Sequence, residues 1–220
     1  MIVTFASSKG GTGKTTLAFN VAVALNPTLC VDLDVGDNRD IGFTFVNGMR
    51  QQQTGKTLNV KQITDRESLV KIIKSDTDEQ LILIDSGGLD YSLNRVAVGC
   101  ADIVIYPSND KALEINSLLD FDGIVTKMSD AAKRKINVHV IASRTNYAKK
   151  TWPDLQNACN LSKNMIFSGL SLPMYVDLSD SFGDGKAINE YAANSHANIH
   201  MQQIVNYIKQ QLQQKGNNDE

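Results

Sequence analysis

The sequence predicts a single-domain α/β protein with a mostly parallel, twisted β-sheet and helices on both of its faces. Two observations predict this class. Short apolar runs alternate along the chain with longer segments of helical periodicity, and most of these runs lack the polar alternation of half-exposed strands. No repeat or Pro/Gly/Ser-rich linker divides the chain, so we expect one domain over residues 1–213 and a disordered tail over 214–220.

The elements follow from this alternation in chain order. The first apolar run lacks a basic leader, so we interpret it as a strand and not as a signal peptide. We expect strands at Ile2–Ala6, Thr28–Leu33, Leu81–Ile84, Ile103–Tyr106, Val138–Ala142 and Met165–Phe167. We expect helices at Thr15–Leu25, Leu113–Met128 and Ala187–Gln213. The polar segment Gly48–Val60 is expected to be a loop or an edge element.

Composition excludes several classes of protein. The three cysteines form no C-x-x-C pair, which argues against a zinc site or a disulfide framework and favours a reducing cytoplasm. The net charge of −2 is not that of a general polyanion binder. Residues 123–170 nevertheless carry eight basic and two acidic side chains, a local balance of +6. This asymmetry indicates an anionic partner, although a solvated helix face would also explain it.

The segment between the first strand and the first helix has the residues of a phosphate-binding loop. It reads Lys9-Gly10-Gly11-Thr12-Gly13-Lys14-Thr15-Thr16. Ser8 stands where the strict G-x-x-x-x-G-K-[ST] motif requires glycine, but the remaining glycines still allow consecutive main-chain amides to face a phosphate. We expect Lys14 to reach the β- and γ-phosphates, Thr15 to bind Mg²⁺ and Thr16 to contact the α-phosphate.

Lys9 makes the motif more specific, because the segment KGGTGKTT resembles the signature of the deviant Walker-A ATPases of the ParA/MinD family. The resemblance covers nearly the whole chain in motif order and is closest to the small plasmid-partition members. It implies a P-loop NTPase fold and a dimer with two ATP molecules at its interface. In that dimer, Lys9 would reach the nucleotide of the partner.

Two strand ends supply acidic residues. Asp32 and Asp34 end the second strand, and Asp85 follows the apolar run Leu81–Ile84. The resemblance implies that Asp34 activates the attacking water and that Asp32 and Asp85 support Mg²⁺, with Asn38 as a further polar residue. Gly87 and Gly88 would let a switch loop move beside the γ-phosphate. Surface acids in loops are the alternative interpretation.

Later motifs add the nucleotide base. The resemblance places Arg144, after the strand Val138–Ala142, and Pro173, before the last helices, near the adenine. A solvated or DNA-facing position is the alternative for Arg144. It also implies non-specific DNA binding and a centromere-binding adaptor, which together drive plasmid or chromosome partition from a cytoplasmic, nucleoid-associated state. The DNA-binding candidates are Lys133, Arg134, Lys135, Lys149 and Lys150.

Two alternatives stay open. The first is a membrane-cycling positioning ATPase of the MinD type, which the sequence Asp34-Val35-Gly36 favours. The final helix has few basic residues on its polar face, which argues against this alternative and against a stable membrane anchor. The second is a metabolic P-loop enzyme of the same fold, such as a dethiobiotin-synthetase-like ligase. Such enzymes generally lack the signature lysine, so Lys9 argues against it.

Overall fold

The computed structural model of the chain describes residues 1–34, 42–75, 80–87 and 92–216. In this part of the chain seven strands form one sheet in the order β3-β2-β4-β1-β5-β6-β7, and all neighbouring strands are parallel. The predicted α/β class and parallel sheet are therefore confirmed. The strands are β1 (Ile2–Phe5), β2 (Leu29–Asp32), β3 (Val60–Gln62), β4 (Ile82–Asp85), β5 (Ile103–Ser108), β6 (Val138–Ser143) and β7 (Met165–Leu172).

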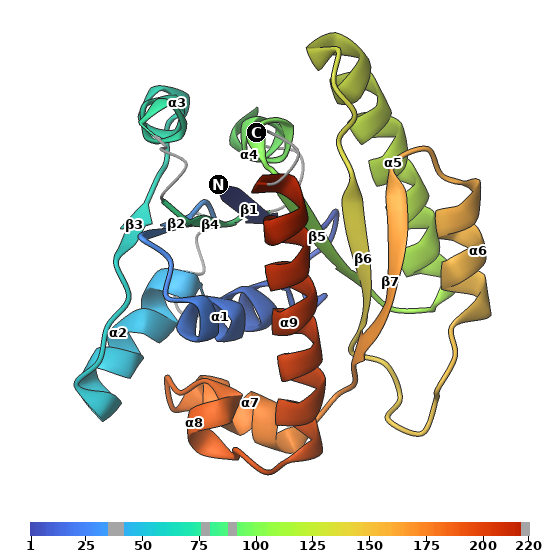
Figure 1. Cartoon of the computed structure of the whole chain (residues 1–220). Coiled ribbons are helices and arrows are strands. Elements are labelled where there is room, and N and C mark those ends of the chain that lie inside the picture. The colour runs from blue at the N-terminus through green and yellow to red at the C-terminus, as the bar shows by residue number, and fades with distance from the viewer. Residues whose placement is uncertain (35–41, 76–79, 88–91, 217–220) are drawn as a thin grey trace.

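Helices cover both faces of the sheet (Figure 1). One face carries α3 (Arg66–Lys74), α4 (Ser92–Cys100), α5 (Ala112–Ala132) and α6 (Pro153–Leu161). The other face carries α1 (Lys14–Leu25), α2 (Phe43–Thr54), α7 (Val176–Gly183), α8 (Ile188–Tyr191) and α9 (His196–Gly216). Each face therefore has its own hydrophobic core, which explains why the central strands are apolar on both sides.

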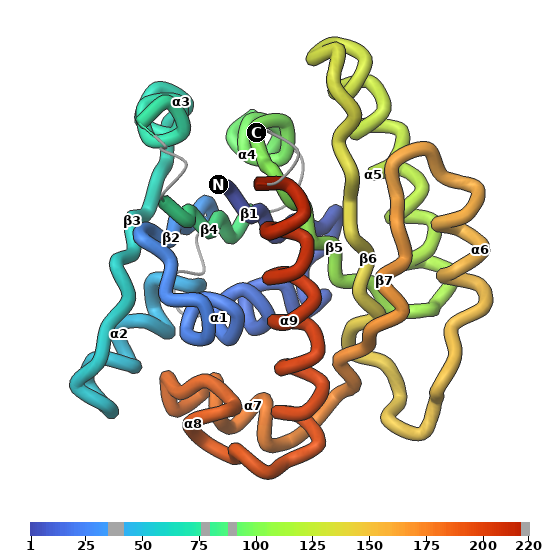
Figure 2. Tube along the Cα trace, viewed as in Figure 1, coloured from blue at the N-terminus to red at the C-terminus, as the bar shows by residue number. Residues whose placement is uncertain are grey.

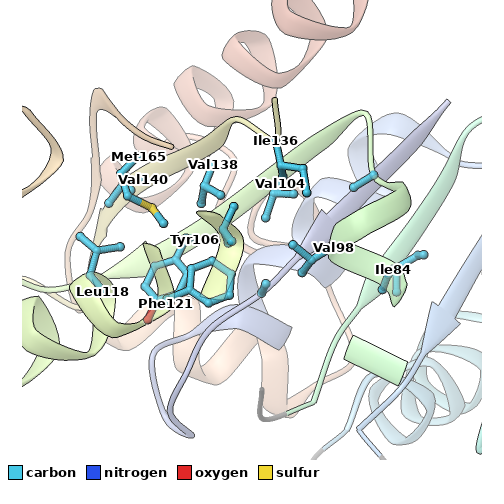
Figure 3. Close-up of a cluster of buried hydrophobic side chains, with 14 of the residues drawn as sticks. Ile84, Val98, Val104, Tyr106, Leu118, Phe121, Ile136, Val138, Val140 and Met165 are labelled. Atoms are coloured by element: carbon cyan, nitrogen blue, oxygen red, sulfur yellow. The ribbon is translucent and has the colours of Figure 1, made fainter. Parts of the chain in front are cut away.

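The core beneath α4, α5 and α6 fixes the strands that carry the loops of interest. Tyr106 of β5 lies against Phe121 of α5 with ring centroids 4.8 Å apart, next to Val104 of the same strand and Val138 and Val140 of the neighbouring strand β6 (Figure 3). These side chains are almost fully buried. Close packing of this kind holds the carboxyl ends of β5 and β6 in register.

The order in which strands are added to the sheet reverses at β1. Strands β2, β3 and β4 lie on one side of this central strand, and β5, β6 and β7 lie on the other. In open α/β sheets a ligand crevice forms at such a switch point, outside the carboxyl ends of the strands. The loops that follow β1, β2, β4 and β6 all leave the sheet at this edge.

Some expected elements are wrong or incomplete. The segment 48–60, expected to be a loop or an edge element, completes helix α2 and begins the edge strand β3. The periodic segment 187–213 forms two helices, because residues 192–195 interrupt it between α8 and α9. The strand expected at Met165–Phe167 continues to Leu172. Helix α9 extends to Gly216, beyond the boundary at 213 where disorder was expected, and residues 217–220 lie outside the described part.

Candidate nucleotide-binding site

The loop between β1 and α1 adopts a conformation that requires glycine. Gly11 and Gly13 have φ angles of 78° and 89°, in the left-handed region that side chains disfavour. A Cβ atom at Gly13 would also lie 3.1 Å from Ser143 Oγ. The glycines of the predicted motif therefore stand where the loop turns and where β6 approaches it.

The end of β6 holds this loop from one side. Ser143 Oγ donates a hydrogen bond to the Thr12 carbonyl at 2.9 Å, and Arg144 Nη1 donates one to the Gly11 carbonyl at 2.5 Å. Two carbonyls of the loop are therefore bound to the end of β6. The Thr12 hydroxyl is buried and has no hydrogen-bond partner among the described residues, so a ligand could satisfy it.

Helix α5 and strand β5 hold the loop from the other side. Ser8 N donates to the Tyr106 hydroxyl at 3.2 Å, and Ser8 Oγ donates to the Ser117 carbonyl at 3.1 Å. Lys9 Nζ donates to the Leu113 carbonyl at 2.9 Å. The side chain of Lys9 thus lies against the first turn of α5, at the edge of the sheet that carries the loop.

Lys14 and Asp85 meet at the floor of the loop. Lys14 Nζ lies 3.2 Å from Asp85 Oδ1, and the two side chains are only 9% and 0% exposed. Burial raises the pKa of Asp85, and the neighbouring Lys14 ammonium opposes that rise. The second oxygen, Oδ2, has no partner in the described part of the chain. The pair leaves one carboxylate oxygen and one ammonium near the loop with unused bonding capacity.

Asp32 lies beside Asp85 but is bound differently. The two residues are register partners on β2 and β4. The carboxylate of Asp32 accepts hydrogen bonds from Asp34 N at 3.0 Å, Thr44 N at 2.9 Å and Thr44 Oγ1 at 2.7 Å. Asp32 therefore ties the start of α2 to the sheet. Thr44 carries no signal in the sequence, because twelve residues separate it from Asp32 and no local motif joins them.

Asp34 is exposed at the same edge and lies close to Gly87. A Cβ atom at Gly87 would lie 3.3 Å from Asp34 Oδ1, so this position accepts only glycine without a shift. Two other residues of the sequence analysis, Asn38 and Gly88, lie outside the described residues, as does the Val35-Gly36 sequence.

A pocket lies beside the loop between β1 and α1, on the side where α1 begins. Its volume is about 270 Å³, and its lining includes Gly13 and Thr16 of the loop, Arg144, and Pro173. The remaining lining comes largely from β7, α7 and the turn between them: Leu172, Met174, Tyr175, Leu178, Ser179 and Phe182. A pocket lined by both apolar and polar side chains, next to a candidate phosphate loop, suits a flat heterocycle. Among the sequence candidates, Arg144 and Pro173 both line it.

The five basic candidates for DNA binding do not form one surface. Lys133, Arg134 and Lys135 precede β6, whereas Lys149 and Lys150 follow it, so the two groups lie at opposite ends of the sheet (Figures 1 and 2). Arg134 Nη2 donates to the carbonyls of Gly99 and Ala101 at the end of α4. A cation there complements the helix dipole, which is a structural role. The five candidates therefore belong to two separate surfaces.

The acidic residues do not form a metal site by themselves. Within the described residues, no group of three or more His, Cys, Asp or Glu side chains could hold a metal ion. Mg²⁺ commonly takes one or two carboxylates and completes its shell with water and phosphate oxygens. Asp85, whose Oδ2 has no hydrogen-bond partner among the described residues, and the nearby hydroxyl of Thr15 fit such a shell. Asp32 fits less well, because its oxygens already accept three hydrogen bonds.

The loop, the buried lysine–aspartate pair and the parallel sheet define a P-loop nucleotide-binding domain. Residues 3–216 match the family described as the CobQ/CobB/MinD/ParA nucleotide binding domain, and the chain belongs to that family. A curated relative, Protein ParA of Rhizobium radiobacter, is 29% identical over 142 residues, which are 61% of this chain and 60% of that protein. The chain thus spans about 60% of the length of this relative.

Solved structures share the fold across almost the whole chain. The cell-division ATPase MinD of Pyrococcus furiosus has a TM-score of 0.70 at 17% identity, covering 95% of this chain and 98% of that one. MinD of Pyrococcus horikoshii with Mg-ADP has a TM-score of 0.68 at 18% identity, covering 94% and 95%. A complex of a Cyanothece McdA variant with ATP has a TM-score of 0.69 at 15% identity, covering 94% and 96%.

Proposed function

We propose that this chain is a ParA-type ATPase that binds ATP with Mg²⁺, dimerises on ATP, binds non-specific DNA and drives DNA partition with a centromere-binding adaptor. The observation that carries the proposal is the buried contact between Lys14 and Asp85 beneath a glycine loop. Two charges held at this depth are costly without a further partner, and a triphosphate with its metal would supply that partner. The relative named ParA and the ADP- and ATP-bound structures of similar fold support the nucleotide.

The residues have distinct roles in this proposal. The amides of the loop and the Lys14 ammonium hold the phosphates, and the pocket beside Pro173 holds the base. When bound, Mg²⁺ would neutralise phosphate charge, with Asp85 and Thr15 as its protein ligands. Asp34 is exposed at the carboxyl edge, where its carboxylate can orient a water molecule. Lys9 leaves the Leu113 carbonyl and reaches the nucleotide of a second copy.

For DNA binding, the position of Lys149 and Lys150 favours this pair over the group that precedes β6. Both are exposed in the loop after β6, at the same edge as the nucleotide site. Lys149 forms an ion pair with Asp110, and Lys150 lies 5.6 Å from the centre of the Tyr147 ring. Contacts of lysine with phosphates are independent of sequence and weaken with salt.

A MinD-like membrane cycle is the alternative for the same fold. No helix in the described part of the chain has the length and hydrophobicity of a membrane span. Helix α9 turns its apolar stripe inward, with Met201, Ile204, Val205 and Ile208 almost fully buried. That stripe is therefore not available to insert into a lipid surface, which favours the DNA-binding proposal over the alternative.

The decisive experiment measures binding to DNA and to lipid vesicles, for the wild-type protein and for two variants. Retention of the protein on non-specific DNA is measured with ATP, with ADP and across a salt series, and flotation with anionic vesicles is measured in parallel. We expect ATP-dependent retention on DNA and none on vesicles. The variant Lys149→Glu/Lys150→Glu should lose retention, whereas Lys133→Glu/Lys135→Glu, at the opposite edge, should keep it. ATP-dependent flotation without DNA retention would replace the proposal with the membrane alternative.

A further inference from the structure

Helix α2 is bound near its start to Asp32 in the nucleotide site and in its later half to α8. At its start, Thr44 donates two hydrogen bonds to Asp32, the register partner of Asp85. In its later half, Arg50 is 4% exposed and forms a bidentate pair with Glu190 of α8, at 2.5 and 2.8 Å. Planar, bidentate pairs of this kind fix orientation as well as distance. The helix thus connects the acidic edge of the site with α8.

The segment from α7 to α8 is also part of the nucleotide site. Leu178, Ser179 and Phe182 of α7 line the pocket proposed for the base. Directly after α7, Gly185 packs against α2 so closely that a Cβ atom would lie 2.4 Å from the main-chain nitrogen of Arg50. The turn that follows the pocket-lining helix α7 is therefore in direct contact with α2, with backbone against backbone.

Two further contacts complete the connection on the same face of the sheet. Phe19 of α1 makes edge contacts with Phe43 of α2 and with Phe182 of α7, both with ring centroids 5.9 Å apart. Asn20 Oδ1 accepts a hydrogen bond from Ile188 N of α8 at 2.7 Å. Because α1 begins at the phosphate loop, α1, α2 and the α7–α8 segment form one packed unit around the site.

We propose that Arg50 and Glu190 are positioning residues that couple occupation of the base pocket to the placement of Asp32. A base that contacts α7 stabilises the α7–α8 segment. Because the Arg50–Glu190 pair joins α8 to α2, the position of α2 is then restricted as well. Thr44, at the start of α2, then holds the Asp32 carboxylate beside Asp85. The inference rests on the proposed nucleotide site. It explains how a base that is remote from the phosphates would affect the positions of Asp32 and Asp85.

Amide hydrogen exchange tests this coupling without requiring hydrolysis. Adenosine monophosphate serves as the probe, because it fills the base pocket without supplying a β- or γ-phosphate. In the wild-type protein we expect it to slow exchange in residues 43–50 at least about threefold, in addition to exchange in α7. In Glu190→Gln, which keeps the shape of the side chain but removes its charge, protection should persist in α7 and disappear in residues 43–50.

A matched variant on the same segment controls for general loosening. Lys186→Gln removes an exposed ion pair with Asp184, at 3.8 Å, and leaves Arg50 and Glu190 intact, so protection of residues 43–50 should be retained. Arg50→Lys, which keeps the charge but not the planar fork, should behave like Glu190→Gln.

The outcomes separate the two proposals. Protection of α7 with no change in residues 43–50 of the wild-type protein would overturn the coupling while leaving the base pocket in place. Equal protection of residues 43–50 in Glu190→Gln and in the wild-type protein would also overturn it. Failure of the wild-type protein to bind the probe would contradict the base pocket itself, and the coupling with it. Loss of folding in both variants, measured by circular dichroism, would reduce the pair to a structural role and likewise overturn the coupling.

Discussion

At the scale of single residues, the site constrains which side chains are tolerated, by space at Gly13 and by charge at Lys14 and Asp85. Gly13 combines a positive φ angle with a close approach to Ser143, so both the backbone and the space exclude a side chain there. Lys14 and Asp85 are buried together, and each would be left as an uncompensated charge if the other were removed. The site therefore depends on a small number of positions that tolerate little substitution.

His139 gives the chain a pH dependence away from the nucleotide site. Burial lowers the pKa of His139 from 6.5 to about 4, and its Nδ1 atom lies 2.7 Å from the Tyr207 hydroxyl. The unfolded chain therefore binds a proton between these pH values that the folded chain excludes. The titration of His139 therefore leaves the free energy of unfolding unchanged above pH 6.5. It lowers this free energy as the pH falls towards 4, by roughly 3 kcal/mol in total.

This linkage predicts a specific difference between variants. Chemical denaturation of His139→Gln at a series of pH values should show a weaker loss of unfolding free energy between pH 6.5 and 4 than the wild-type protein shows. His196→Gln, at an exposed position, should follow the wild-type curve. Parallel curves for the wild-type protein and His139→Gln would contradict the burial of a neutral imidazole.

At the scale of elements, the contact between α2 and the turn after α7 is the tightest backbone approach among the described glycines. Gly185 has a φ angle of 65° and leaves no room for a Cβ atom beside Arg50. Because the obstructing atoms are main-chain atoms, a side chain at 185 can be accommodated only if α2 moves. The position of α2, and with it the Thr44–Asp32 contact, depends on this glycine.

Gly185→Ala should therefore destabilise the fold by about 2–5 kcal/mol, the sum of backbone strain and overpacking. Gly183→Ala is the matched control, because a Cβ atom there would meet no atom within 4 Å, and its unfolding free energy should stay near that of the wild-type protein. Equilibrium urea denaturation measures both. A Gly185→Ala protein as stable as the control would show that the two segments are not in backbone contact.

The sequence predicted those elements whose signals are local. Continuous apolar runs identified the central strands, and the glycine–lysine segment identified the turn between β1 and α1. Helix α2 was missed because its buried side chains are Phe43, Val46 and Arg50, so an arginine interrupts the apolar period. The Arg50–Glu190 pair joins residues 140 positions apart, and no pattern in the sequence indicates a contact over that distance.

At the scale of the molecule, the described residues proposed for the nucleotide site lie at one edge of the sheet. The loop, the acidic residues, the pocket beside Pro173 and the side chain of Lys9 all lie at the carboxyl ends of the strands. Exposed apolar side chains occur at the same edge, in the first turns of α5 and α7 and in the connecting segments: Leu113, Val176, Tyr147 and Met174. An edge with both features suits the proposed ATP-dependent contact between two copies of the chain.

This arrangement predicts a selective defect in Lys9→Ala. The Lys9 ammonium is bound to the Leu113 carbonyl, whereas Lys14 pairs with Asp85 inside the loop, so a single chain of the variant should still bind ATP. Light scattering should show that the variant stays monomeric with ATP and Mg²⁺ while the wild-type protein dimerises. Lys111→Ala, a neighbouring lysine at the start of α5, should dimerise normally. Normal dimerisation of Lys9→Ala would contradict the role of Lys9 in a second copy.

The central claim is that the loop above the Lys14–Asp85 pair holds a triphosphate, and calorimetric titration of ATP in the presence of Mg²⁺ tests it most directly. The wild-type protein should bind about one ATP per chain, and Lys14→Ala should bind at least about tenfold more weakly, because a charge-assisted contact to phosphate contributes about 1.5–3 kcal/mol. Absence of binding by the wild-type protein, or equal affinity in Lys14→Ala, would contradict the account.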